Sequence, residues 1–403
     1  MLVLASCSSD EGSVVLEDAA VPMAEAGAEP IAEAGADVTV DADAAPPGPV
    51  VTPRAVECTS PPCAKALVRT LSESDRAEGY CVLLEDKTVA CWGSNSTGQL
   101  GRGDGGVVSS SRAERVPGLA NVESLHHTCA VDSAGEVWCW GQGPYLQSTA
   151  GFTNEMSPVK LPVPKAKRVA YSQQTGCGIF EHGIQCWGRN TNGQIDPLAV
   201  GSTTPYEPTA MALPEAAAAA PRAIAVSNAT FVLLDDGTAL SWGKNPPIGR
   251  LSSLPRDPHP DFVPLMSVQD LDTVSDNACA VVGNTAHCWG PPTDLDLRPL
   301  PKPIVTPEPI VQISTTRSKG SQEPWRWCAV GVSGAVHCWG YNANGQAGDG
   351  TLEFAMDPVK VDGLPAPAVE VKVMPYSSCA LLVTGKVFCW GSNYYGQIGN
   401  GRN

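Results

Sequence analysis

Fifteen cysteines give this 403-residue chain its most conspicuous potential chemistry. Twelve of them form six pairs separated by nine or ten residues, and the second member of each pair stands directly before a tryptophan. Thiols at such spacing can form disulfides, bind a metal or remain reduced in a core. The six pairs are Cys81 with Cys91, Cys129 with Cys139, Cys177 with Cys186, Cys279 with Cys288, Cys328 with Cys338 and Cys379 with Cys389, and Cys58 with Cys63 is a further candidate pair.

The residues between paired cysteines favour disulfides across β-hairpins. Pairing Cys129 directly with Cys139 leaves the three-residue loop 133–135, which ends in the glycine that a left-handed turn position prefers. In one equivalent segment Phe231 and Ser241 replace both cysteines, as expected if each cysteine matters only through its partner. Zinc is disfavoured, because the closely spaced cysteines and the Cys/His clusters of zinc sites do not occur.

Other residues with catalytic potential do not form a recognisable constellation. His287 and His337 occupy one repeat position that other units fill with unrelated residue types, so we expect a structural role. His126 and His127 lead into a predicted strand and are expected on its surface. The sequence contains no nucleophile elbow, phosphate loop or HExxH helix. We therefore expect no catalytic activity, no cofactor and no metal.

The dipeptide Trp-Gly recurs seven times at intervals of 47–55 residues. Each copy ends a predicted hairpin of two apolar runs, with an alternating stretch before it and usually a Pro/Val segment after it. Four short strands in about 50 residues match one propeller blade. The sequence thus predicts an all-β fold, a seven-bladed β-propeller of four-stranded antiparallel blades over residues 49–403. The tryptophans are Trp92, Trp140, Trp187, Trp242, Trp289, Trp339 and Trp390.

Four of the Trp-Gly dipeptides are followed by an Asn-x-x-Gly-Gln element, whose asparagines are Asn95, Asn190, Asn342 and Asn393. This pattern resembles the repeats of the regulator of chromosome condensation family. The resemblance covers the chain from about residue 51 and implies a seven-bladed propeller. It also implies guanine-nucleotide exchange on a small GTPase as one candidate activity. Intracellular members of the family often keep cysteines at these positions as reduced core residues, which is the alternative to disulfides.

The amino-terminal residues 1–7, MLVLASC, resemble a truncated lipoprotein signal in which a lipobox precedes an acylated Cys7. The basic region of such signals is missing and the apolar stretch is short, so we expect the start to lie inside a longer signal peptide. Residues 8–48 follow as an acidic, Ala/Pro-rich segment without Lys or Arg. We expect a disordered tether there, and a tail without lipid is the alternative.

Composition narrows the class of protein further. A formal charge of −16 disfavours nucleic acid as a partner. With Cys7 acylated and the cysteines oxidised, the protein is expected outside the cytoplasm, in the cell envelope. It would be lipid-anchored to a bacterial membrane, at the outer membrane or cell surface. A monomer is expected.

The seventh unit reaches Asn403 soon after its third predicted strand. An unpaired third strand would leave a sheet edge open. Residues 49–56 have the Pro/Val character of the outer strands. They are therefore predicted to close the ring by pairing beside residues 386–390.

A partner surface is predicted in the sixth unit, where the stretch before the hairpin is unusually long. It carries Arg317, Lys319, Trp325, Arg326 and Trp327, residue types that are enriched at interface hot spots. For Trp327, packing against its own blade is the alternative.

Three functions remain open. The first is a non-catalytic propeller scaffold, displayed at the surface or in the periplasm, that binds a protein partner. The second is exchange activity on a small GTPase, which the family resemblance implies. The third is an extracellular enzyme inhibitor, like the secreted bacterial propellers of this repeat type that inhibit β-lactamases.

Overall fold

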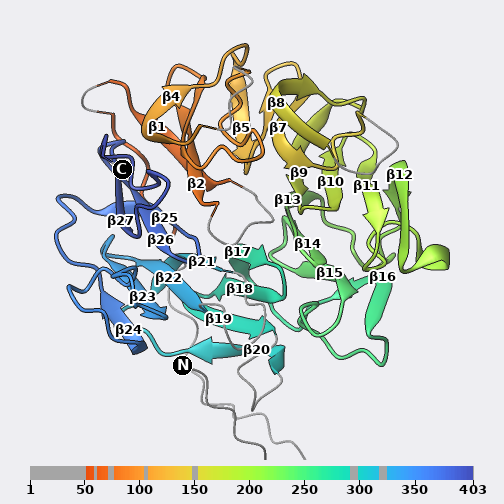
Figure 1. The fold of residues 1–403 in the computed structure, drawn as a ribbon. Helices are drawn as coiled ribbons and strands as arrows, with labels where there is room; N and C mark the ends of the chain where they lie inside the picture. Colours follow the sequence, from red (N-terminus) through yellow and green to blue (C-terminus); the bar gives the residue numbers. More distant parts are fainter. Residues whose placement is uncertain are drawn as a thin grey trace, which may run out of the picture. The chain divides into compact units, whose positions relative to one another are not determined.

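The structure is a computed structural model that describes residues 51–58, 61–70, 77–103, 108–147, 153–290, 298–316 and 325–402. The predicted segments 1–7 and 8–48, with Cys7, lie outside the described residues. Between Ala64 and Gly391 the strands form seven antiparallel sheets arranged as blades around one axis (Figure 1). The predicted seven-bladed β-propeller is confirmed.

Each blade uses strands in chain order from the axis outward. The first three blades are β1 (Ala64–Arg69), β2 (Gly79–Leu84), β3 (Val89–Gly93) and β4 (Ser110–Arg115); β5 (Val122–His126), β6 (Cys129–Asp132), β7 (Val137–Gly143) and β8 (Thr153–Lys160); and β9 (Ala166–Tyr171), β10 (Thr175–Phe180), β11 (Gly183–Asn190) and β12 (Ser202–Met211). A 3-10 turn, η1 (Pro197–Ala199), precedes β12.

The last four blades repeat this order. They are β13 (Pro221–Val226), β14 (Ala229–Leu234), β15 (Ala239–Lys244) and β16 (Arg256–Phe262); β17 (Val268–Val274), β18 (Asn277–Val282), β19 (Thr285–Gly290) and β20 (Arg298–Ile304); β21 (Ile310–Thr315), β22 (Arg326–Gly331), β23 (Val336–Gly340) and β24 (Ala355–Lys360); and β25 (Ala368–Val373), β26 (Ser377–Leu382) and β27 (Val387–Gly391).

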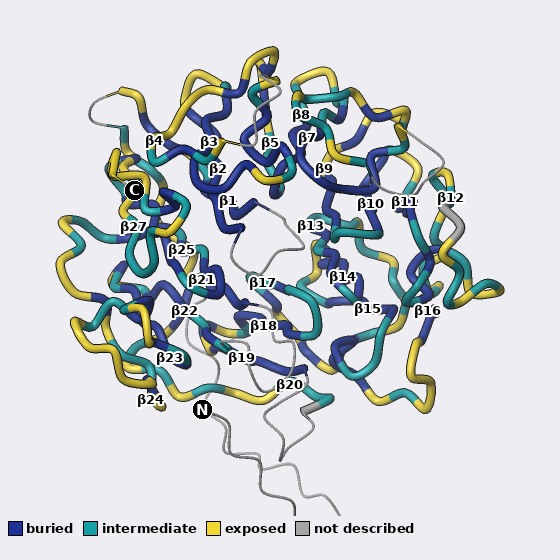
Figure 2. The backbone as a smooth tube through the Cα atoms, in the orientation of Figure 1, coloured by how far each residue is buried: buried dark blue, intermediate teal, exposed yellow. Residues whose placement is uncertain are grey.

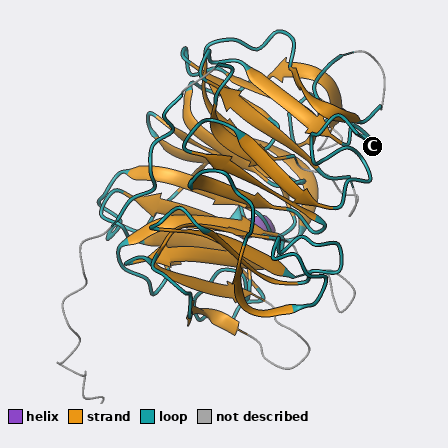
Figure 3. Cartoon of the chain, turned by 90° about the vertical axis from the view of Figure 1, so that its left-hand side faces the viewer, coloured by secondary structure: helices purple, strands orange, loops and turns teal. Residues whose placement is uncertain are grey.

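The antiparallel order gives the propeller two different faces. Connections from first to second and from third to fourth strands emerge on one side, which we call the loop face. The tight turns between second and third strands lie on the opposite side, together with the connections between blades, and we call this the turn face. In side view, strands make up almost all of the regular structure (Figure 3). Among the described residues, no helix has the length and apolar character needed to cross a bilayer.

The paired cysteines lie directly opposite each other on the second and third strands of six blades. Their Cα atoms are 4.0–4.1 Å apart, and a disulfide joins each pair. The bonds join Cys81 to Cys91, Cys129 to Cys139, Cys177 to Cys186, Cys279 to Cys288, Cys328 to Cys338 and Cys379 to Cys389.

These cysteines are core residues as well as cross-links. Five of the six partners on the third strands are buried, and Cys389 on the seventh blade is half-buried; the buried five are Cys91, Cys139, Cys186, Cys288 and Cys338. The partners on the second strands are all buried too. Because burial and oxidation leave no accessible thiol at these positions, the twelve cysteines have a structural role and form no binding or metal site.

The hairpin turns take the conformation that their length requires. Gly135 in the second blade has a φ of 80°, in the left-handed region that glycine enters at least cost. In the first blade, Lys87 adopts the same conformation at the matching position, with a φ of 61°. The turn geometry is thus kept even where the glycine is absent.

A tryptophan indole connects neighbouring blades. The indole N–H of Trp140, in the second blade, donates to the backbone carbonyl of Gln99, in the loop of the first blade, at 2.9 Å. Trp92 closes the ring in the same way, because it donates to the carbonyl of Gln397 at 2.9 Å. Six of the seven tryptophans make this bond among the described residues, the others being Trp187, Trp242, Trp289 and Trp390.

The Asn-x-x-Gly-Gln element builds the loop that offers this carbonyl. In the sixth blade the buried Asn342 accepts from the backbone N–H of Ala347 at 2.7 Å and donates to the carbonyl of Thr351 at 3.1 Å. Gln346 accepts from the N–H of Asn344 at 2.7 Å. These side chains hold the loop in shape, which is a structural role. The asparagines that accept the equivalent bond in other blades are Asn95, Asn190 and Asn393.

The predicted closing strand is wrong. The seventh sheet has three strands among the described residues, and residues 51–57 do not pair with β27. Val51 instead exchanges hydrogen bonds with the side chain of Asn284 at 2.9 Å, and the N–H of Glu57 donates to Val383 at 2.6 Å. Pro53 supplies no N–H for a strand ladder, and the chain must next enter the innermost strand β1. This segment therefore crosses the turn face.

The first and seventh blades nevertheless meet through the contact that recurs between blades. The N–H of Ala64 donates to the turn carbonyl of Gly385 at 2.9 Å. The N–H of Ala166 donates to Gly135 in the same way at 2.8 Å. Backbone turns and the Trp92 bond thus close the ring without a shared strand.

We predict that Asn342→Ala lowers the free energy of unfolding by about 2 kcal/mol, because it leaves the buried N–H of Ala347 without its acceptor. Thermal and denaturant unfolding followed by tryptophan fluorescence would measure the loss. Asn344→Ala is the matched control, since this exposed side chain lies two residues away in the same loop. Equal losses for the two variants would contradict the role given to Asn342.

Candidate functional site

A cavity of about 760 Å³ opens at the centre of the loop face. Its wall contains the ends of first strands and the starts of second strands from several blades. The third and fourth blades contribute most, and their loops add the amide side chains of Gln174, Asn192, Asn228 and Asn245. The cavity therefore offers many hydrogen-bonding groups and few charged ones.

An ion pair beside this cavity joins the first blade to the fifth. Arg69 forms a two-pronged contact with Asp272, at 2.7 and 3.0 Å, and also donates to the carbonyl of Thr315 at 2.7 Å. Burial alone would raise the pKa of Asp272, but Arg69, Lys372 and hydrogen bonds outweigh it and hold the pKa below its ordinary value. The pair is therefore charged and structural.

Side chains also join the innermost strands on one side of the ring. Asp270 accepts from the N–H of Ile313 at 3.0 Å, and Glu370 accepts from the N–H of Leu67 at 2.9 Å. Gln312, at the same register position in the sixth blade, accepts from the N–H of Val371 at 2.9 Å. The first, second and fourth blades carry the shorter Ala66, Ser124 and Ala223 at this position.

The fully buried Glu78 forms part of the cavity wall at the seam between the first and seventh blades. It accepts hydrogen bonds from the N–H of Tyr376 at 2.6 Å and from the hydroxyl of Ser377 at 2.5 Å. Burial raises its pKa to about 7, although these bonds and Arg326 lower it in part. Glu78 is therefore the lining carboxyl that titrates near neutral pH.

The prediction that Arg326 contacts a partner is wrong. Its side chain is buried and donates to the carbonyls of Gln346, Met374 and Ser377 at 2.8–3.2 Å, and also to the hydroxyl of Ser378. Burial lowers its pKa to about 10, so it remains charged at neutral pH. Arg326 joins the sixth and seventh blades because its guanidinium satisfies several buried carbonyls at once.

The other residues of the predicted partner surface divide into two groups. Arg317 and Lys319 lie outside the described residues. Trp327 stacks on Trp339 of its own blade with ring centroids 6.1 Å apart, so the packing alternative holds. Trp325 is half-buried on the loop face and stays a candidate.

The histidines expected on a strand surface lie near the axis instead. His127 is buried, lines the cavity and contacts the carbonyl of Arg69 through Nδ1 at 2.9 Å. Burial lowers its pKa to about 3, so the ring is neutral. Among the described lining residues it contacts a carbonyl rather than a hydroxyl or thiol, which does not match a base–nucleophile pair.

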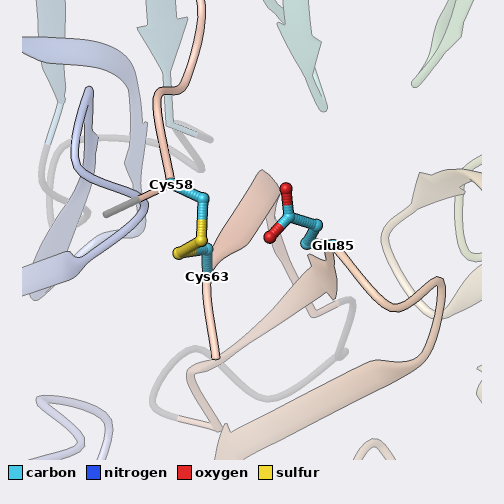
Figure 4. A group of neighbouring side chains, drawn as sticks. All are labelled: Cys58, Cys63 and Glu85. Carbon is cyan, nitrogen blue, oxygen red and sulfur yellow. A yellow bond between two sulfur atoms is a disulfide. The ribbon is translucent and has the colours of Figure 1, made fainter. Parts of the chain in front are cut away.

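Cys58, Cys63 and Glu85 form a group close enough for metal ligation (Figure 4). The two sulfurs are joined in a disulfide, with Cα atoms 5.8 Å apart, so neither is available as a thiolate. The disulfide closes the turn directly before β1, which begins at Ala64. Its place at the start of the first strand supports a structural role for Cys58 and Cys63.

Exposed apolar side chains extend the loop face outward from the cavity. Leu198 is 95% exposed and Leu251 is 76% exposed, on third-to-fourth strand connections of adjacent blades. Val200 and Pro255, close to them in the chain, line the cavity itself. Burial mapped on the backbone shows exposed segments around the ring and buried strands within it (Figure 2). We call Leu198, Val200, Leu251 and Leu254 the apolar rim.

These features define a seven-bladed repeat propeller with an axial cavity and an apolar rim. Residues 375–397 match the Regulator of chromosome condensation (RCC1) repeat. The Arabidopsis thaliana ultraviolet-B receptor UVR8 is 26% identical over 377 residues, which cover 86% of this chain and 69% of the receptor. The chain is similar to the regulator of chromosome condensation repeat family in these comparisons.

Two solved structures share the fold. Human WBSCR16 has a TM-score of 0.63 at 19% identity, covering 78% of this chain and 92% of that one. Prp20p from Saccharomyces cerevisiae has a TM-score of 0.56 at 17% identity, covering 73% of this chain and 78% of that one, and its structure was described with its binding properties to Gsp1p and histones. At these identities the likeness establishes the fold.

Glu78 makes the stability of the ring depend on pH. Its pKa is raised in the folded state, so between about pH 4.5 and pH 7 the folded protein keeps a proton that the unfolded chain has lost. This contribution is therefore favourable at low pH and is lost as the pH rises. We predict that Glu78→Gln raises the melting temperature relative to wild type more at pH 8 than at pH 5. The corresponding gain in the free energy of unfolding is at most about 3 kcal/mol larger at pH 8 than at pH 5.

Calorimetry or circular dichroism at both pH values would measure this difference. Glu207→Gln, at an exposed carboxylate, is the control and should change neither curve. A Glu78→Gln effect that is the same at both pH values would show that Glu78 does not titrate in this range.

Proposed function

We propose that the protein is a non-catalytic scaffold that binds a protein partner through its loop face. The observation that carries this proposal is the apolar rim, because it continues into the polar wall of the axial cavity. A Cβ atom at Gly201 would lie 3.2 Å from the guanidinium of Arg256. The loops of the third and fourth blades therefore lie against each other. An apolar patch bordered by hydrogen-bonding groups is typical of protein interfaces.

Rigidity supports the same function. Loops on a rigid scaffold commonly carry recognition, because the scaffold fixes their geometry before the partner arrives. Six blades carry a cross-strand disulfide, and indole bonds join neighbouring blades. The strands that flank the rim are thus fixed in the ring, which limits the conformational entropy lost on binding.

An extracytoplasmic location, with Cys7 acylated and residues 8–48 as a tether, completes the proposal. Seven disulfides among the described residues favour an oxidising compartment. Nucleotide exchange on a small GTPase is the alternative, and its support is the fold shared with Prp20p, which was described with its binding properties to Gsp1p. The disulfides favour the envelope scaffold over this cytosolic activity.

We predict that Leu198→Ser combined with Leu251→Ser weakens partner binding at least about 10-fold, as expected when hot-spot contacts are lost. Immobilised wild-type and variant proteins would be exposed to solubilised envelope proteins, and the retained proteins quantified by mass spectrometry. Met266→Ser combined with Val305→Ser is the control, because both are exposed apolar residues at connections between blades, on the turn face.

The proposal requires a protein that is retained by wild type and control and lost by the rim variant. Equal retention by both double variants would move the binding site away from the rim. Unchanged melting temperatures would exclude unfolding as the cause of a loss.

A further inference from the structure

Two cations face each other across the outer ladder of the fourth blade. Strands β15 and β16 are neighbours in this sheet (Figure 1), and their register places Lys244 directly opposite Arg256. Side chains at opposite positions lie on the same face of a sheet, and both of these residues line the axial cavity. Like charges at such positions destabilise the ladder. The fourth blade therefore holds two positive charges side by side on the cavity wall.

Lys244 has a carboxylate partner. Its Nζ donates to one carboxylate oxygen of Asp276 at 2.7 Å, and the other oxygen accepts from the amide of Asn228 at 2.7 Å. Asp276 itself is not among the described residues that line the cavity. One carboxylate therefore offsets one of the two cations and fixes the position of Lys244.

Arg256 has no such partner. It is exposed, and its side chain makes no ion pair or hydrogen bond with a described residue. The carboxylate of the neighbouring Asp257 is buried and pairs with Arg250 at 2.8 Å. The guanidinium of Arg256 instead lies close to Gly201, at the boundary between the loops of the third and fourth blades. Its charge is therefore available to a ligand that enters the cavity.

The cavity wall reverses the charge balance of the chain. The chain carries 42 acidic and 26 basic residues, whereas the described lining residues include three cations and one carboxyl group. The third cation is Arg69, whose charge Asp272 offsets. The carboxyl group is Glu78, and burial raises its pKa to about 7, so it is protonated in part at neutral pH. A basic wall in an acidic protein favours an anionic occupant.

Apolar side chains flank Arg256 on both sides. Pro255 precedes it and Val200 adjoins Gly201, and both line the cavity. Leu198 and Leu251 of the apolar rim are exposed a few residues away in the same two loops. The cavity volume of about 760 Å³ is in the range of ligand pockets and exceeds what an inorganic anion fills. The fitting occupant is thus a carboxylate with aliphatic neighbours.

We propose that Lys244 and Arg256 form a carboxylate subsite, which binds an acidic side chain on a protruding loop of the partner protein. Arg256 donates two parallel hydrogen bonds to the carboxylate, and Lys244 adds a second positive charge. The aliphatic neighbours of the acidic residue pack on the apolar rim. This inference names the part of the partner that enters the cavity, so it rests on the function proposed above.

The test uses two peptides that differ in one charge, Gly-Leu-Glu-Leu-Gly and Gly-Leu-Gln-Leu-Gly. Both ends are blocked and the fluorophore is neutral, so the glutamate supplies the only carboxylate. Fluorescence anisotropy with the full chain should show saturable binding of the glutamate peptide and at least about 5-fold weaker binding of the glutamine peptide. Arg256→Gln should abolish this preference. Arg112→Gln is the matched control and should keep it, because Arg112 is exposed on the fourth strand of the first blade, outside the cavity lining.

Equal affinity of the two peptides for wild type, or a preference that survives Arg256→Gln, would overturn the subsite. Glutarate serves as a free dicarboxylate in a competition experiment. If glutarate bound as tightly as the glutamate peptide, the site would take a small molecule, and this result would also overturn the proposal. Both variants should melt as wild type does, because both arginines are exposed.

The capture of envelope proteins separates this inference from the proposed function. Arg256→Gln should retain at least about 5-fold less of the protein that the wild type retains, and Arg112→Gln should retain as much as the wild type. A partner that the rim variant loses and Arg256→Gln keeps would overturn the subsite and leave the proposed function intact. A partner that both variants keep would contradict both.

Discussion

The hydrogen bond from a tryptophan indole to the loop carbonyl of the preceding blade is the interaction on which the ring depends. In four seams the acceptor belongs to the glutamine of the Asn-x-x-Gly-Gln element, as with Gln99 and Gln397. In two others it belongs to Pro144 or Pro247, where the element is replaced by proline-rich sequence. The acceptor is a backbone carbonyl, so the seam survives the loss of the side chains that normally shape the loop. This explains how degenerate units remain part of one ring.

The disulfides are a secondary reinforcement. The fourth blade shows this, because Phe231 and Ser241 face each other there without a covalent bond. Ser241 donates to the carbonyl of Ile248 at 2.6 Å, and Phe231 packs edge-on against Trp289 of the next blade. That blade keeps the pairing and seam of its neighbours. Each disulfide therefore stabilises one hairpin, while the seams hold the hairpins in a ring.

The sequence predicts what is local and repeated. Seven Trp-Gly dipeptides, the hairpins before them and the facing cysteines all depend on short spacings that the chain displays directly. The pair of Arg69 and Asp272 is different, because 203 residues separate the partners and neither belongs to the repeat signature. Arg326 shows the same limit: an arginine beside tryptophans has the composition of a hot spot, but its burial depends on carbonyls from the seventh blade. The path of residues 51–57 could not be predicted from the sequence either, because it depends on the side chain of Asn284, which is distant in the chain.

The central claim is that the seam between the chain's first and last blades is equivalent to the internal seams. The most direct measurement is differential scanning calorimetry of Trp92→Phe beside Trp140→Phe, since both tryptophans are buried and each donates one indole bond at 2.9 Å. A closed ring predicts similar drops in melting temperature for the two variants and a single cooperative transition for both. An unchanged melting temperature for Trp92→Phe, or two separated transitions in wild type, would show that the ring is open at this seam.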